Sequence, residues 1–232
     1  KGLLYSEDSP LRQGFIEMKY MTAREEDILT NTNYIEKGIV IDKLLQSLIV
    51  TKINYKELLL GDKNAIMIAA RVLGYGADYT FEYMGNSYTV DLSEVEDKVL
   101  NESLLIDGKN EVKFTLPTSK IDVTCKFLSH LDDNKINKEI EGLKKLDKLS
   151  DRTLSTRLKN TLLSVNGDYD TKVIRDFVDN TMLARDSRAL RNYLKEIQPD
   201  VDLTFDHTDG AGKTQRVDIP IGVQFFWPDA GI

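Results

Sequence analysis

Hydrophobic residues between positions 61 and 92 first follow a helical spacing and then a strand spacing. One helical face is formed by residues at i, i+3, i+4 and i+7, namely Ile66, Ala69, Ala70 and Leu73. Because Met67, Ile68 and Val72 add apolar character around this face, the pattern predicts a helix buried on several sides. Asp62 is the expected N-cap, and Gly74 is the expected stop in a left-handed conformation.

Beyond this helix, apolar residues alternate with polar ones, as in a half-buried strand. The apolar positions are Tyr79, Phe81 and Tyr83, followed by Tyr88, Val90 and Leu92. Gly85-Asn86 lies between the two runs and is a turn signal, so the pattern predicts a β-hairpin. Each strand has one apolar face, which we expect to pack against the preceding helix.

The segments before this helix predict two more helices and a short strand. Thr22 and Glu25 have the spacing of a capping box, which indicates a helix reaching about Leu29. Residues 39–50 carry a helical stripe, and residues 14–21 are a candidate strand.

The second half of the chain alternates between strand and helix patterns. Residues 111–116 and 121–127 predict a second strand pair. Residues 134–198 predict four helices, the second of them with the stripe Leu154, Leu158, Leu162 and Val165, and the third capped by Asp170. Apolar and polar residues alternate again from Val201, which predicts a C-terminal hairpin that turns at residues 209–212.

Together these elements predict an α+β fold with N-terminal helices, β-hairpins and a helical middle segment. We expect four parts. They are an N-terminal arm with a short strand (1–22), helices plus β-hairpins (23–129), a helical subdomain (130–199), and a C-terminal β-hairpin with an aromatic end (200–232).

Composition narrows the function classes. The net charge of −7 disfavours nucleic-acid binding, which needs a basic face. No apolar run approaches the roughly 18 residues of a transmembrane helix, so we expect no membrane partner. Cys125 is the only cysteine and lies on the apolar side of its strand, which predicts a core residue in a reducing compartment.

No motif in the chain predicts catalysis or a cofactor. The sequence GAGKT at residues 210–214 resembles a phosphate-binding loop, but His207 replaces the required first glycine and the segment joins two strands. We expect His130 and His207 to lie on the surface without a metal. Residues 132–134 resemble the start of a calcium loop, but the later ligands are missing, which favours a helix cap. We therefore expect no catalytic residue, no cofactor, no metal and no small-molecule substrate.

Apolar groups near the two chain ends are the candidate partner-binding residues. The aromatic end, FFW at 225–227, either anchors the last strand or forms an exposed patch. We expect the polar N-terminal arm to order only against a partner. The predicted partner-binding residues are Leu3, Leu4, Tyr5, Leu11, Phe226 and Trp227.

Three short motifs, in this order, resemble a known family. The first is MTAREEDIL at 21–29, the second combines LGDKNA at 60–65 with GYG at 74–76, and the third combines IP at 219–220 with FFWP at 225–228. Together they resemble the baseplate hub subunit and hub assembly chaperone family of T-even-type bacteriophages. The motifs span nearly the whole chain.

The resemblance implies a structural or assembly protein and no enzyme. Its expected partners are other phage baseplate and tail proteins, and its expected location is the virion tail baseplate, or the host cytoplasm during assembly. Many family members carry Cys-x-x-Cys knuckles at the two hairpin turns, which here read MGNS (84–87) and HTDG (207–210), so zinc is not carried over. The alternative is a small cytosolic α+β enzyme or regulator with an unrecognised carboxylate site.

Overall fold

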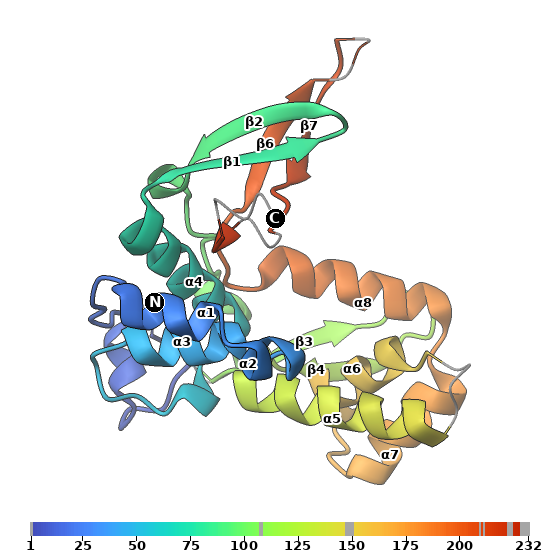
Figure 1. The fold of residues 1–232 in the computed structure, drawn as a ribbon. Coiled ribbons are helices and arrows are strands. Elements are labelled where there is room, and N and C mark those ends of the chain that lie inside the picture. The colour runs from blue at the N-terminus through green and yellow to red at the C-terminus, as the bar shows by residue number, and fades with distance from the viewer. Residues whose placement is uncertain are drawn as a thin grey trace. The chain divides into compact units, whose positions relative to one another are not determined.

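The computed structural model describes residues 2–106, 109–146, 151–208, 210, 212–221 and 225–227. Within these residues helices alternate with short antiparallel strands, which confirms the α+β prediction (Figure 1). The chain divides into two compact units, each built from three segments. Unit 1 contains Lys1–Phe15, Ile53–Leu60 and Val99–Pro199, whereas unit 2 contains Ile16–Lys52, Gly61–Lys98 and Asp200–Ile232.

Unit 1 combines a three-stranded sheet with four α-helices. The sheet has the order β3-β4-β5, with β3 (Val112–Thr115), β4 (Asp122–Cys125) and β5 (Leu162–Val165) all antiparallel. Its helices are α5 (His130–Leu146), α6 (Thr153–Thr161), α7 (Thr171–Asp176) and α8 (Ala184–Ile197). Short 3₁₀ turns are η1 (Pro10–Gln13), η2 (Tyr55–Glu57) and η4 (Glu102–Leu104), and η5 (Phe177–Thr181) is a π-helical turn after α7.

Strand β5 corrects two predictions. The stripe that ends in Leu162 and Val165 is not one helix, because α6 stops at Thr161 and the next four residues form β5, which pairs with β4. Leu162 lies opposite Cys125 and Val165 opposite Val123, so sheet pairing buries both side chains. The sheet therefore crosses the expected boundary between 129 and 130, and the four-part division differs from the two units observed.

Unit 2 contains a group of helices and two β-hairpins. Its helices are α1 (Ala23–Leu29), α2 (Thr32–Glu36), α3 (Val40–Leu48) and α4 (Leu60–Tyr75), the first residue of which belongs to unit 1. The hairpins are β1 (Asp78–Tyr83) with β2 (Asn86–Asp91), and β6 (Thr204–Thr208) with β7 (Thr214–Asp218), and η3 (Leu92–Glu94) follows β2. The expected strand at 14–21 is reduced to a single bridge between Met18 and Ile49.

Helix α4 starts earlier and ends later than its sequence pattern predicts. Asp62 lies inside the first turn instead of at the cap, where its carboxylate still faces the positive end of the helix dipole. The prediction that Gly74 is left-handed is wrong. The helix continues to Tyr75, and Gly76 takes the positive φ of 84°. The Arg71 guanidinium fixes this stop by donating to the Gly76 carbonyl oxygen at 2.7 Å.

The first hairpin turns at Met84-Gly85, one residue before the expected Gly85-Asn86. Both turn residues have positive φ, and Asn86 pairs with Tyr83. The apolar face of this hairpin packs against the second hairpin. The Phe81 and Phe205 ring centroids lie 4.9 Å apart, so an aromatic core joins β1 to β6 within unit 2.

Candidate functional site

Residues 2–15 of the N-terminal arm pack into unit 1. Tyr5 and Leu11 are buried, and Leu3 and Leu4 are half-buried. The Leu59 N–H donates to the Tyr5 hydroxyl at 3.0 Å, and Arg12 donates to the carbonyl oxygens of Leu3 and Tyr5. The expectation that this arm orders only against a partner is therefore wrong, because the chain itself supplies the contacts. Tyr5 and Leu11 are core residues, whereas the role of Leu3 and Leu4 stays a prediction.

The aromatic end is packed into unit 2. Phe225 and Phe226 are 0% and 2% exposed, and the Phe225 ring meets the Tyr79 ring edge-on at 5.1 Å. The Tyr79 hydroxyl donates to the Pro220 carbonyl oxygen at 2.8 Å. Phe226 is thus an anchor, which corrects its assignment as a partner contact. Trp227 is half-buried and keeps its partner-binding prediction.

Both histidines are buried, so the surface prediction for them is wrong. In unit 2, His207 Nδ1 lies 2.8 Å from the Tyr88 hydroxyl, and its ring meets that of Tyr83 at 5.0 Å. In unit 1, His130 packs edge-on against Tyr55. The alternation of Phe205 with His207 was a sequence signal that both side chains share one face of a strand.

Cys125 is confirmed as a core residue. Its side chain is 0% exposed, and burial raises the pKa of its thiol to about 12. Because the thiolate is the reactive form, this cysteine is inert near neutral pH.

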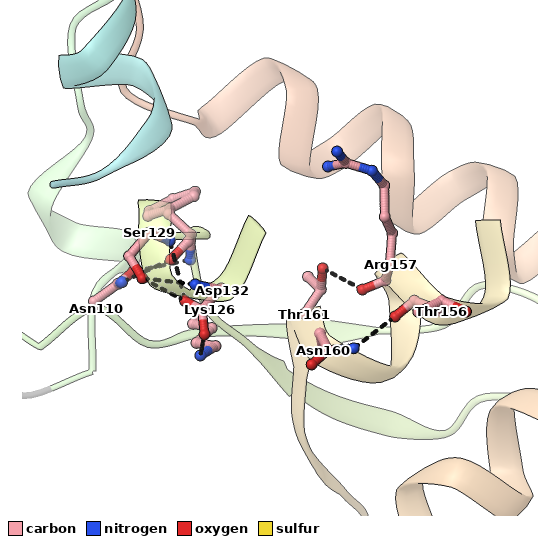
Figure 2. Close-up of polar contacts among 9 residues, drawn as sticks. Asn110, Lys126, Ser129, Asp132, Thr156, Arg157, Asn160 and Thr161 are labelled. Carbon is pink, nitrogen blue, oxygen red and sulfur yellow. Dashed lines mark hydrogen bonds and ion pairs between the residues drawn. The ribbon is translucent and has the colours of Figure 1, made fainter. Parts of the chain in front are cut away.

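The clearest cluster of charged and polar side chains in unit 1 lies where β4 leads into α5 (Figure 2). Lys126 donates to Asp132 at 2.7 Å, and both the backbone N–H and the hydroxyl of Ser129 donate to the same carboxylate at 3.0 and 2.8 Å. Burial alone would raise the pKa of Asp132, but the hydrogen bonds from Lys126 and Ser129 outweigh it and lower that pKa. Asn110 clamps the Phe127 backbone N–H and carbonyl, each at 2.9 Å.

This cluster fixes the start of α5. The Asp132 carboxylate is neutralised by an ammonium group and bonds the Ser129 N–H, so it closes the first turn of the helix. A general base needs a lone pair aimed at a substrate, and here both carboxylate oxygens of Asp132 accept hydrogen bonds from within the chain. The helix-cap interpretation of residues 132–134 is confirmed, and no group of three or more side chains able to hold a metal occurs in the described parts of the chain.

A second set of polar contacts in Figure 2 closes the end of α6. Asn160 donates to the Thr156 carbonyl oxygen and Thr161 to the Arg157 carbonyl oxygen, both at 2.9 Å. Arg157 also pairs with Asp133 on α5 at 2.8 Å. These contacts lie in the last turn of α6, which ends one residue before β5 begins.

Glu25 is a buried residue in the first turn of α1, and both oxygens of its carboxylate accept hydrogen bonds. It accepts from Lys19 and Ser47 at 2.8 Å each, and from the hydroxyl of Thr22 at 2.6 Å. These hydrogen bonds, that from Lys19 above all, lower the pKa of Glu25 to about 2. The capping box predicted from the sequence is present.

Glu25→Gln is expected to lower the free energy of unfolding by about 2 kcal/mol at pH 7, because the bonds to a charged acceptor are lost. The folded-state pKa lies below the ordinary value of 4.5, so this stabilisation is complete above pH 4.5 and disappears as the pH falls towards about 2. Urea denaturation of both proteins at pH 7 and pH 3 measures the difference. Glu26→Gln, at the exposed neighbour, is the control, and an equal difference at both pH values for Glu25→Gln would contradict the prediction.

Within unit 2 the first motif contacts the second, and the third motif packs on the hairpin that follows the second. A Cβ atom on Gly74, in the second motif, would lie 2.9 Å from Met21 Cε and 3.3 Å from Met21 Cβ, so Met21 of the first motif covers it. Close packing against Met21 therefore favours glycine at position 74, in contrast to the backbone reason expected from the sequence. The third motif supplies Pro220 and Phe225, which meet Tyr79 at the start of the first hairpin.

No helix in the described residues has the length and apolar character needed to cross a membrane.

No family model, no curated protein sequence and no solved structure matches this chain. The geometry above and the motif residues are therefore the observations on which a function can be argued.

Proposed function

We propose that the chain is a tail baseplate protein of a T-even-type bacteriophage, either a hub subunit or a hub assembly chaperone, and that it acts through protein–protein contacts. The main observation in support of the proposal is that Met21 packs against Gly74. These residues belong to two motifs separated by about fifty positions in the sequence, and they are in direct contact within one unit.

The other motif residues hold the same unit together, which supports the resemblance. Glu25 of the first motif bonds Ser47 of α3, and Lys63 of the second motif pairs with Asp42 of α3 at 2.5 Å. Asn64 of the second motif donates to Asp200 at 3.0 Å, close to the start of the last segment of unit 2. A family signature preserved for a fold is expected to fall on such contacts.

The polar groups that the structure brings together also fit a protein that works by binding. The Lys126–Asp132 and Glu25 clusters are bonded within the chain and stabilise helix starts. Trp227 is half-buried at the end of unit 2 and offers an aromatic edge of the kind found in interface hot spots.

The test is fractionation of a lysate from cells infected by the phage that encodes this chain. We expect the protein to sediment with tail baseplates if it is a hub subunit, or with baseplate assembly intermediates alone if it is a chaperone. Mass spectrometry of each fraction identifies it. Its absence from both kinds of particle, while it is present as a free protein, would overturn the proposal.

A further inference from the structure

Helix α8 carries a row of cations along its exposed side. Arg185, Arg188, Arg191 and Lys195 are all exposed, and their spacing places them on about a third of the helix circumference over about 15 Å. The opposite side of α8 is fixed to the sheet, since Leu190 is fully buried and the Tyr193 ring stacks on Phe114 at 4.5 Å. Figure 1 shows α8 lying along the three-stranded sheet of unit 1.

The three arginines in this row have no carboxylate partner among the residues that the structure describes. Two half-buried arginines of unit 1 do have one, since Arg157 pairs with Asp133 and Arg175 with Glu139. The acidic residue closest to Arg185 in the sequence, Asp186, is buried and bonds the backbone N–H groups of Thr118 and Ser119 at 2.7 and 3.0 Å. It therefore faces away from the row.

The row opposes the stability of its own helix. Arg185 and Arg188, Arg188 and Arg191, and Arg191 and Lys195 are three or four positions apart, where like charges repel. Glu196 is not three or four positions from any of these cations, so it does not offset the repulsion. For the three arginines, which have no carboxylate partner among the described residues, this repulsion is explained if a ligand of opposite charge neutralises it.

The charge of the chain is also divided unevenly. Unit 1 has 21 Lys and Arg against 19 Asp and Glu, a net charge of +2, whereas unit 2 has 10 against 19, a net charge of −9. The net negative charge of the chain thus comes from unit 2. The row on α8 belongs to unit 1, whose net charge does not repel a negatively charged partner.

The geometry of the row favours an acidic helix over a nucleic acid. Carboxylates at every third or fourth position of a second helix rise by about 4.5–6 Å, which matches the step between these cations, whereas same-face residues of a strand are about 6.7 Å apart. Nucleic-acid sites combine a strongly basic domain with free aromatic rings. Here the unit is close to neutral, and Tyr193 is stacked against the sheet.

We propose that the exposed row Arg185, Arg188, Arg191 and Lys195 is a docking site for a helix of a partner protein that carries a matching row of carboxylates. None of the three family motifs lies on α8, so this inference is independent of the phage assignment. Arginine suits the role because its planar guanidinium binds a carboxylate through two hydrogen bonds.

The test uses the full chain and a labelled peptide helix of about 20 residues with glutamate at every third or fourth position on one face. The reversal R185E/R188E/R191E is expected to weaken binding about tenfold or more in fluorescence anisotropy. The control K135E/K138E/K144E makes the same change in charge on exposed α5 positions and is expected to change binding less than about threefold. Circular dichroism verifies that each variant is folded. If R185E/R188E/R191E is unfolded, the neutral variant R185Q/R188Q/R191Q is used in its place.

Three further measurements identify the occupant. A peptide of the same composition with its glutamates scattered around the helix should bind more weakly than the one-faced peptide, and so should single-stranded DNA. The proposal would be overturned if the scattered peptide bound as tightly as the one-faced peptide, or if single-stranded DNA bound more tightly than that peptide. It would also be overturned if the α5 control lost as much binding as the α8 reversal. Sedimentation of the protein alone tests whether a second copy of the chain occupies the row. Self-association that the α8 reversal abolishes would assign the row to that second copy instead.

Discussion

Phe226→Ala is expected to lower the free energy of unfolding by about 3–5 kcal/mol, the cost of emptying a buried aromatic site. Phe226 is 2% exposed, and its ring meets that of Phe225 edge-on at 5.0 Å. Phe225 in turn contacts Tyr79, so the loss extends to the start of the first hairpin. Urea denaturation followed by far-ultraviolet circular dichroism measures the change.

Phe15→Ala is the matched control, because the same side chain is removed from a position that is 66% exposed. That variant should stay within about 0.5 kcal/mol of the parent protein. Trp227→Ala should fall between the two, since Trp227 is half-buried. A Phe226→Ala protein as stable as the Phe15→Ala protein would show that the aromatic end is an exposed patch after all.

Local patterns predicted the parts of the fold that depend on neighbours in the sequence. The capping box from Thr22 to Glu25 and the alternating strands of the first hairpin are set by residues a few positions apart. The helical stripe predicted within residues 39–50 comprises Val40, Leu44, Leu45 and Leu48, and the three leucines are buried while Val40 is half-buried. These elements need no knowledge of what packs against them.

The errors arise where distant residues decide the conformation. Gly74 resembles a helix stop, but the helix continues to Tyr75, and Gly76, whose carbonyl oxygen accepts from Arg71, takes the positive φ. Residues 162–165 fit a helical stripe, but an antiparallel partner at β4 buries them as a strand. Spacing alone cannot distinguish these outcomes, because either conformation buries the same apolar side chains.

The proposed docking row on α8 was likewise only partly visible in the sequence. Arginine at every third position from Arg185 to Arg191 is visible in the sequence. Its exposure, and the engagement of Asp186 by the backbone of Thr118 and Ser119, required the structure. Conversely, the apolar residues near the chain ends suggested interfaces, and the structure buries Tyr5, Leu11 and Phe226 within their own units.

Tyr5→Ala is expected to lower the free energy of unfolding by about 3–4 kcal/mol, because it removes a buried ring and leaves a backbone donor without its partner. The donor is the Leu59 N–H, which reaches the Tyr5 hydroxyl at 3.0 Å across 54 positions of the sequence. Tyr5→Phe keeps the ring and removes the hydroxyl that accepts this hydrogen bond, and should cost about 1–3 kcal/mol. Urea denaturation of the three proteins at one pH gives both values.

Tyr169→Ala serves as the control, because Tyr169 also lies in unit 1 but is 62% exposed. Its effect should be below about 0.5 kcal/mol. If Tyr5→Ala were equally mild, the Tyr5 ring and its hydrogen bond to Leu59 would contribute little to unit 1, and Tyr5 would again be a candidate for binding a partner. A loss near the expected value means that the arm closes unit 1 through Leu59, so truncations made to reach a smaller folded protein must retain it.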